Sequence, residues 1–126
     1  MIQILLTVIS YDVWFYISHV LLHTSMLYPF HAEHHSKEEP MFLDAYRGHM
    51  FESGFQSLGM VVPCLLYTYT PTEIGVILVI LNVRGMMRHD RRCAFLIGDH
   101  HLIHHKYPNC NYSEYWVDLL CGTLRY

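Results

Sequence analysis

The hydrophobic pattern divides the chain into two long apolar stretches, each followed by a polar segment rich in histidine. The first stretch covers residues 2–22 and is interrupted only by Gln3, Asp12, His19 and a few hydroxyl side chains. A helix of this length is about 30 Å long, which is about the thickness of the hydrocarbon core of a bilayer. We therefore predict a membrane-spanning helix over residues 2–22.

The second apolar stretch runs from about residue 55 to residue 83 and is divided by Pro71. Each piece has roughly 12 to 16 residues, which is short for a full span. The pattern predicts a helical hairpin that enters the bilayer and returns, so that residues 30–54 and 84–126 lie on the same side. The alternative is a soluble domain with a buried apolar helix pair, which the moderate mean hydropathy leaves open.

The charge distribution indicates which side this is. All eight Lys and Arg residues lie between positions 37 and 125, outside the apolar stretches, and the positive-inside rule makes their side cytoplasmic. Only 15% of the residues are charged, which excludes a disordered chain, a coiled coil and a basic nucleic-acid-binding domain. We expect an all-α integral membrane protein with residues 1–126 as a single domain and no nucleic-acid partner.

The cysteines add no metal motif. None of the four is at C-x-x-C spacing, and the N-terminus has neither a positive region nor a small-residue cleavage site. We expect all of them to be reduced and mostly structural; they are Cys64, Cys93, Cys110 and Cys121.

The histidines are abundant and regularly spaced, and they indicate a metal site. There are 11 histidines, as many as Asp and Glu together, and nine form an ordered set. An H-x-x-x-H pair is followed by H-x-x-H-H, a single histidine and a second H-x-x-H-H. In a helix, positions i, i+3 and i+4 share a face, so we expect the three nitrogens of each longer motif to converge. The set consists of His19, His23, His31, His34, His35, His89, His101, His104 and His105.

The two remaining histidines, His49 and His100, fall outside this spacing, and we interpret them as structural or supporting residues. Imidazole suits iron, zinc, copper and nickel, and the E-x-x-H pairs of carboxylate-rich di-iron bundles are absent from the sequence. The histidines therefore predict a di-metal cap on the cytoplasmic side, acting on a lipid. A lipid C–H bond has no acidic proton, so its oxidation needs a redox cofactor.

Charged residues near the histidines have two further expected roles. Carboxylates commonly accept the free N–H of a metal-bound imidazole. The basic cluster of residues 84–92 is expected to anchor the chain at the membrane surface, or else to dock an acidic electron donor or anionic lipid headgroups. The candidate acceptor carboxylates are Asp12, Asp90, Asp99 and Asp118.

The order of these motifs resembles that of the fatty acid hydroxylase superfamily, which includes sterol desaturases, C4-methylsterol oxidases and fatty acid hydroxylases. Residues 12–35, DVWFYISHVLLHTSMLYPFHAEHH, are similar to its D-x-x-x-Y-x-x-H-x-x-x-H and L-Y-x-x-H-x-x-H-H motifs. Residues 101–126 are similar to its H-x-x-H-H, N-Y and W-D-x-x-x-G-T ending. The chain departs from the family pattern where Val117 separates Trp116 from Asp118, and where Cys93 occupies a position at which some members have a second histidine.

This resemblance implies that residues 1–126 form one catalytic core in an endoplasmic reticulum-type or bacterial inner membrane. It implies that the nine histidines hold two iron ions, with zinc as a substitute in purified protein. It implies O2-dependent hydroxylation or desaturation of a sterol or fatty acyl lipid, with electrons from NAD(P)H through cytochrome b5 or a reductase. Because relatives carry further membrane helices upstream, we expect a homo-oligomer or a helical partner that contacts residues 2–17. The alternatives are a metal-binding membrane protein without redox turnover, holding zinc for instance, and a structural subunit that needs such a partner.

Overall fold

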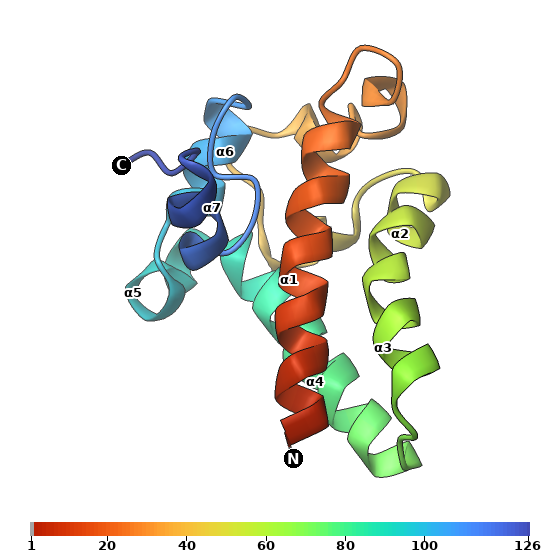
Figure 1. The fold of residues 1–126 in the computed structure, drawn as a ribbon. Coiled ribbons are helices and arrows are strands. Elements are labelled where there is room, and N and C mark those ends of the chain that lie inside the picture. Colours follow the sequence, from red (N-terminus) through yellow and green to blue (C-terminus); the bar gives the residue numbers. More distant parts are fainter. Residues whose placement is uncertain (1) are drawn as a thin grey trace.

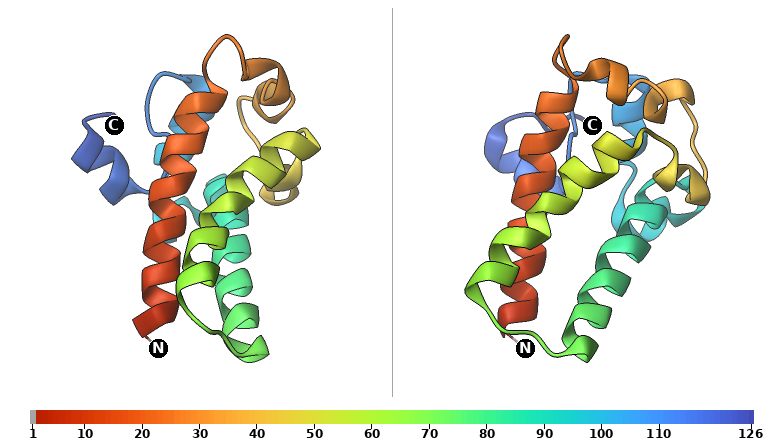
Figure 2. Two further views of the ribbon diagram at one scale, coloured as in Figure 1. Left: turned by 45° about the vertical axis from the view of Figure 1, so that its right-hand side comes forward. Right: turned by 90° about the vertical axis from the view of Figure 1, so that its right-hand side faces the viewer.

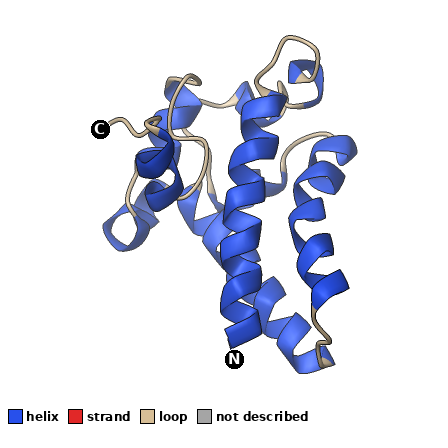
Figure 3. Ribbon diagram, viewed as in Figure 1, coloured by secondary structure: helices blue, strands red, loops and turns tan. Residues whose placement is uncertain are grey.

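The computed structural model describes residues 2–126, and these form helices joined by turns, with no β-strand among them (Figure 3). The expected all-α fold is confirmed. The α-helices are α1 (Ile2–Leu22), α2 (Met50–Ser57), α3 (Val61–Leu66), α4 (Pro71–Arg88), α5 (Ala94–Ile97), α6 (His100–Lys106) and α7 (Tyr115–Cys121). Short 3-10 helices lie between them at η1 (Tyr28–Phe30), η2 (His34–Ser36), η3 (Phe42–Tyr46), η4 (Leu58–Met60) and η5 (Arg91–Cys93).

Helix α1 covers the predicted residues and is the one helix among residues 2–126 that is long and apolar enough to cross a membrane. It stands beside the α2–α3 pair and α4, and the segments that carry the histidines gather at one end of these helices (Figures 1 and 2). Large apolar side chains on α1 remain exposed, among them Leu5 at 58% and Ile9 at 40%. The rest of the chain therefore does not cover the apolar surface of α1.

The predicted break at Pro71 is also confirmed, because α3 ends at Leu66 and α4 begins at Pro71. Proline is favourable in the first turn of a helix, where its missing N–H would have no partner in any case. Thr70 and Glu73 form a capping box there, in which Thr70 Oγ1 accepts from the Glu73 backbone N–H and Glu73 Oε2 accepts from that of Thr70. The two helical arms, α2–α3 and α4, are longer than the predicted apolar block. The first begins at Met50 and the second ends at Arg88, and these polar ends contribute to the histidine-rich end.

Polar contacts fasten α1 to both arms. At its first turn, Gln3 Nε2 donates to Glu73 Oε1 at 2.7 Å on α4. Near its middle, Trp14 Nε1 donates to the Phe55 carbonyl at 2.8 Å on α2. Gly59 allows this close approach, because a Cβ atom there would lie 2.9 Å from Trp14 Cδ1. These contacts hold α1 at a fixed height and rotation relative to the arms.

The segment after α1 differs from the sequence-based expectation. His31 lies in a turn and His34 begins a 3-10 helix, so the first H-x-x-H-H motif is not part of one α-helix. The backbone becomes extended at Lys37, soon after the motif ends. The second motif does lie on an α-helix, α6.

Candidate metal centre

The nine predicted histidines lie in two groups, and the candidate ligand atoms within each group are within 4.8 Å of one another. The first group, the five-histidine cluster, contains His19, His23, His31, His35 and His104. The second group, the four-histidine cluster, contains His34, His89, His101 and His105. His49 and His100 lie outside both groups, as expected.

Each H-x-x-H-H motif is shared between the two clusters, which corrects the expectation that its three nitrogens converge on one point. On α6, His101 and His105 belong to the four-histidine cluster and His104 to the five-histidine cluster. At about 100° per residue, positions i and i+4 point in directions about 40° apart, whereas position i+3 points about 60° to the other side. The α6 motif therefore passes between the clusters, and the same division separates His34 from its two neighbours.

Within the clusters the Nε2 atoms approach closely. His19 and His31 are 3.0 Å apart at Nε2, and His104 and His35 are likewise 3.0 Å apart. In the other cluster, His34 and His89 are 3.1 Å apart. Two nitrogens bound at 2.1 Å and at right angles to one ion would be about 3.0 Å apart, so these spacings fit a coordinated cation.

The opposite ring nitrogens are held by the surrounding protein. Nδ1 of His34 donates to the Arg47 carbonyl at 3.0 Å, and Nδ1 of His89 donates to the Gly85 carbonyl at 2.6 Å. A histidine that donates from Nδ1 carries its proton there when it is neutral, so its Nε2 has only a lone pair. The same arrangement recurs at His19, which pairs with the Tyr112 carbonyl, and at His104, which pairs with the Cys110 carbonyl.

The His34–His89 pair shows why these clusters fit a metal. Both Nδ1 protons are committed to carbonyl oxygens, so two Nε2 lone pairs face each other at 3.1 Å. Two acceptors cannot form a hydrogen bond, and their repulsion is relieved by a cation between them. The nitrogen-only donor set suits a transition metal such as iron or zinc better than magnesium or calcium. The residues present therefore fit a metal centre.

Two other histidines support the same conclusion, because they have ring nitrogens without hydrogen-bond partners. His101 Nδ1 and both ring nitrogens of His105 are buried without a hydrogen-bond partner among residues 2–126. An unsatisfied buried polar group costs roughly 1–3 kcal/mol. Coordination of a cation would provide the missing partner for a buried imidazole nitrogen.

Burial also keeps these rings neutral. It lowers the pKa of His31 to about 4 and that of His105 to about 2, because the imidazolium form loses its hydration. For His105, neighbouring histidines lower the pKa further. A neutral ring presents a lone pair to a cation, so the site is ready to bind metal at neutral pH.

Glu52 supports the five-histidine cluster, and the sequence-based reasoning did not assign it this role. Its Oε1 accepts from His31 Nδ1 at 2.9 Å, while its Oε2 is buried without a partner among the described residues. Burial raises the pKa of Glu52 to about 7. Sequence position gave no sign of this contact, because Glu52 lies 21 residues from His31 and outside any histidine motif.

The four aspartates that we expected to accept histidine N–H groups do not do so. Asp12 pairs with Arg84, Asp90 pairs with Arg92, and Asp99 lies at the start of α6 without a histidine contact. The acceptors are instead mainly backbone carbonyls, which a side-chain pattern cannot reveal.

Asp118 supports the histidines indirectly, through the backbone that accepts their N–H groups. Its two carboxylate oxygens accept from the backbone N–H groups of Tyr112 and Ser113 at 2.8 and 2.7 Å. Asn111, at the positive φ of 56°, begins this turn, and its side chain donates to the His100 carbonyl at 2.9 Å. Asp118 thus fixes the turn whose carbonyls accept from His19 and His100.

The basic cluster is not a uniform surface patch, which corrects a second expectation. Arg84 pairs with Asp12 and Glu114, and Arg88 pairs with Glu114 and is 5% exposed. Arg91 and Arg92 remain exposed. Two of these arginines therefore join α1, α4 and the segment before α7 inside the protein.

The cysteines are all free, as predicted, and none of them joins a histidine cluster. Cys93, which replaces a histidine found in some family members, lies in η5.

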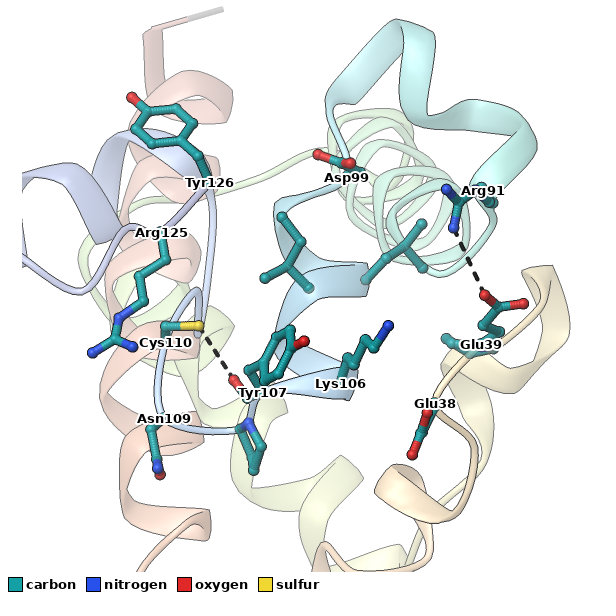
Figure 4. Close-up of a pocket in the computed structure, with 14 residues that line it drawn as sticks. Glu38, Glu39, Arg91, Asp99, Lys106, Tyr107, Asn109, Cys110, Arg125 and Tyr126 are labelled. Atoms are coloured by element: carbon teal, nitrogen blue, oxygen red, sulfur yellow. Dashed lines mark hydrogen bonds and ion pairs between the residues drawn. The ribbon is translucent and has the colours of Figure 1, made fainter.

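Two cavities lie near the clusters. One, of about 190 Å³, is a partly open cleft lined by α1, α2, η3 and α4, and His34 and His89 form part of its wall. The larger, of about 670 Å³, lies on the outer side of α6 and has no cluster histidine in its lining. Figure 4 shows this outer cavity, with the Glu39–Arg91 ion pair at its rim and Cys110 Sγ donating to the Tyr107 carbonyl. The smaller cavity is therefore the one that opens onto the candidate metal centre.

The protein is all-helical within residues 2–126, and its two adjacent histidine clusters give it a site that fits metal ions. Residues 4–123 match the family model of the fatty acid hydroxylases, so the chain belongs to the fatty acid hydroxylase family. This confirms the resemblance found in the sequence and implies an oxidoreductase. No curated protein and no solved structure matches the chain significantly.

Proposed function

We propose that the protein is a membrane-bound, non-haem di-iron oxidoreductase that uses O2 to hydroxylate or desaturate a sterol or fatty acyl lipid. The observation that carries this proposal is the His34–His89 pair, in which two lone pairs face each other in the wall of a partly open cavity. A cation between these rings would lie next to whatever occupies the cavity. Bound iron would supply the dioxygen-dependent redox chemistry that no side chain provides.

The lining of the cavity suits a hydrocarbon chain. Phe15, Met60, Leu78, Leu81 and Met86 contribute apolar side chains to its wall. Such a wall excludes water from the clusters and positions a C–H bond against the His34–His89 side. The cluster histidines would hold the metals, and the carbonyls that accept from their Nδ1 atoms would orient them.

The exposed apolar surface supports a membrane location. Leu65 on α3 is 79% exposed and Val79 on α4 is 62% exposed, and α1 adds further apolar side chains. Soluble monomers rarely expose a continuous apolar patch larger than several hundred Å². In this proposal lipid covers α3 and α4 and a neighbouring protein helix covers one side of α1, and the histidine-rich end lies at the cytoplasmic face of an endoplasmic reticulum-type or bacterial inner membrane.

The reaction also needs two electrons from outside. With O2 and two protons, hydroxylation places one oxygen atom in the lipid and leaves one water, whereas desaturation leaves two waters. In this proposal the electrons come from NAD(P)H through cytochrome b5 or a reductase that approaches the cytoplasmic end.

The test is lipid analysis of cells that express the chain under isotopically labelled dioxygen. We expect a labelled hydroxylipid or a new double bond with the natural sequence, and neither with His104→Ala. His49→Ala is the matched control, because His49 is exposed, caps α2, packs against Phe30 and belongs to neither cluster. Identical lipid profiles for the natural chain and His104→Ala would contradict the proposal. Zinc retained without oxidation would favour a metal-binding protein without turnover, and co-purification of a helical protein required for activity would favour a subunit of a larger enzyme.

A further inference from the structure

Arg88 is a buried cation with an unused hydrogen-bond donor. It is the last residue of α4, its side chain is 5% exposed, and its guanidinium lies over the Phe15 ring at 4.9 Å. One terminal nitrogen, Nη2, donates to Glu114 Oε1. The other, Nη1, is buried without a hydrogen-bond partner among residues 2–126.

The surrounding charges are already balanced. Arg84 and Arg88 are matched by Asp12 and Glu114 in one connected network. What this network lacks is therefore acceptor atoms for two buried nitrogens, Arg84 Nε and Arg88 Nη1, and of these two arginines only Arg88 lines the cavity beside the histidines. Leaving a buried donor unpaired costs roughly 1–3 kcal/mol, and a ligand oxygen would remove this cost.

The cavity beside the four-histidine cluster is where such an oxygen can come from. Arg88 and Phe15 line it together with His34 and His89. Its volume of about 190 Å³ is smaller than the roughly 300–1,000 Å³ of pockets that enclose a whole drug-sized ligand. It therefore suits one end of a lipid, with the remaining chain outside.

The chemistry of the donor selects among lipid ends. A carboxylate or a carbonyl oxygen accepts from a guanidinium without bringing a proton that needs its own acceptor. An alcohol brings such a proton, and a hydrocarbon end leaves Nη1 unpaired.

We infer that Arg88 Nη1 binds the acyl oxygen of a fatty acyl lipid, so that this protein recognises its substrate by the acyl end. This assignment rests on the proposed function for the identity of the cavity as a substrate site. It makes Arg88 a substrate-binding residue and places the carbons next to the acyl group beside His34 and His89. The acyl oxygen comes either from a free carboxylate or from an ester or amide.

The test measures binding without turnover, in zinc-loaded protein reconstituted in lipid nanodiscs. Radiolabelled palmitic acid is the probe, and methyl palmitate, hexadecanol and hexadecane are the competitors. We expect palmitic acid or methyl palmitate to bind at least about tenfold more tightly than hexadecanol and hexadecane. Preference for the acid over the ester, or the reverse, identifies the source of the acyl oxygen.

The variant Arg88→Met should abolish this preference, whereas Arg91→Met should retain it, because the Arg91 side chain is 82% exposed and lies on the outer cavity. If Arg88→Met is unstable because Glu114 has lost a partner, Arg88→Met/Glu114→Gln removes both members of the pair. Zinc content establishes that each variant retains its clusters.

Equal binding of hexadecane or hexadecanol by the natural chain, or an unchanged preference in either Arg88 variant, would overturn the inference. Because zinc supports no oxidation, these outcomes are independent of whether the iron form oxidises lipid. Absence of the acyl preference in the natural chain, together with lipid oxidation by its iron form, would reject the role of Arg88 and leave the proposed function standing.

Discussion

Glu52 and His31 form a hydrogen bond of 2.9 Å between α2 and the turn that follows η1. It is the one contact between a carboxylate and a cluster histidine among residues 2–126 for which the structure gives a hydrogen bond. It orients the ring so that His31 Nε2 faces His19 Nε2. A carboxylate in this position also makes the imidazole a stronger ligand.

Replacing Glu52 by Ala should lower the metal affinity of the five-histidine cluster by about 10- to 100-fold, the usual effect of losing such a partner. Glu52→Gln should retain most of the affinity, because its amide oxygen can still accept from His31 Nδ1. Competition with a chelator measures the affinity for zinc, and the exposed Glu38→Ala serves as control. Equal affinities for the Ala variant and the natural chain would show that His31 needs no such support.

The division of ligands predicts separable effects on metal content. The natural chain should hold about two metal ions, one per cluster. His34→Ala should lose mainly the ion of the four-histidine cluster, and His104→Ala mainly that of the five-histidine cluster. Elemental analysis of purified protein measures this, with His49→Ala expected to retain both ions. Full metal content in the His34→Ala/His104→Ala double variant would show that these rings are not ligands.

The metal-free protein should lose stability as the pH falls below about 6.5. The pKa of His31 in the folded state is about 4 and that of His105 about 2, against 6.5 for an exposed histidine. Between these values the unfolded chain binds protons that the folded chain does not, so acid favours unfolding.

Thermal unfolding with a chelator present, from pH about 8 down to about 5, measures this dependence. The midpoint should fall below pH about 6.5, because several cluster histidines outweigh Glu52, whose pKa of about 7 gives a change of opposite sign. A midpoint that does not change with pH would mean that these histidines are accessible to protons in the folded state.

Features that depend on neighbouring residues in the sequence were predictable, whereas features that depend on distant contacts were not. Residues 2–22 form a predominantly apolar stretch without proline or glycine, and α1 has these bounds because nothing within it favours a turn. The nine histidines were identified from spacing alone, and they do gather. Pro71 marked the break between the two pieces of the second apolar stretch, and α4 begins at this residue because proline is favourable in the first turn of a helix.

The division into two clusters was not predictable, because it depends on side-chain directions in short turns such as the one at His31. The Nδ1 acceptors were missed for a related reason. Carbonyls such as those of Arg47 and Gly85 belong to every residue type, so no sequence pattern distinguishes them. Asp12 was assigned to a histidine but pairs with Arg84, a partner 72 positions away that only the packing of α1 on α4 brings close.

The proposed topology predicts that Lys37, Arg91 and Arg125 are all exposed to the cytosol. Single cysteines at these positions should react with a membrane-impermeant reagent only after the cytoplasmic face is made accessible. The background chain should have Cys64 and Cys121 replaced, since both are exposed. Labelling of position 37 and position 91 from opposite sides would rule out the hairpin arrangement.

The uncovered side of α1 predicts a protein contact. Leu5, Ile9 and Val13 are 58%, 40% and 40% exposed and lie four residues apart, so they form one stripe. Cysteines at these positions should cross-link to a second copy or to another helical protein in native membranes. Cysteine at Thr7, which is buried, should not. An exclusively monomeric protein that still oxidises lipid would show that lipid alone covers the stripe.

The C-terminal turn contacts the N-terminal helix α1, and this affects the order in which the site forms during synthesis. His19 obtains its Nδ1 acceptor from Tyr112, 93 positions later, and His23 faces His104, 81 positions later. Chains emerge from the ribosome N-terminus first, so α1 is available for insertion long before these partners exist. In the proposed membrane enzyme, metal loading is therefore expected late in biogenesis, and a chain stalled or cleaved before residue 112 would leave α1 with histidines that lack their partners.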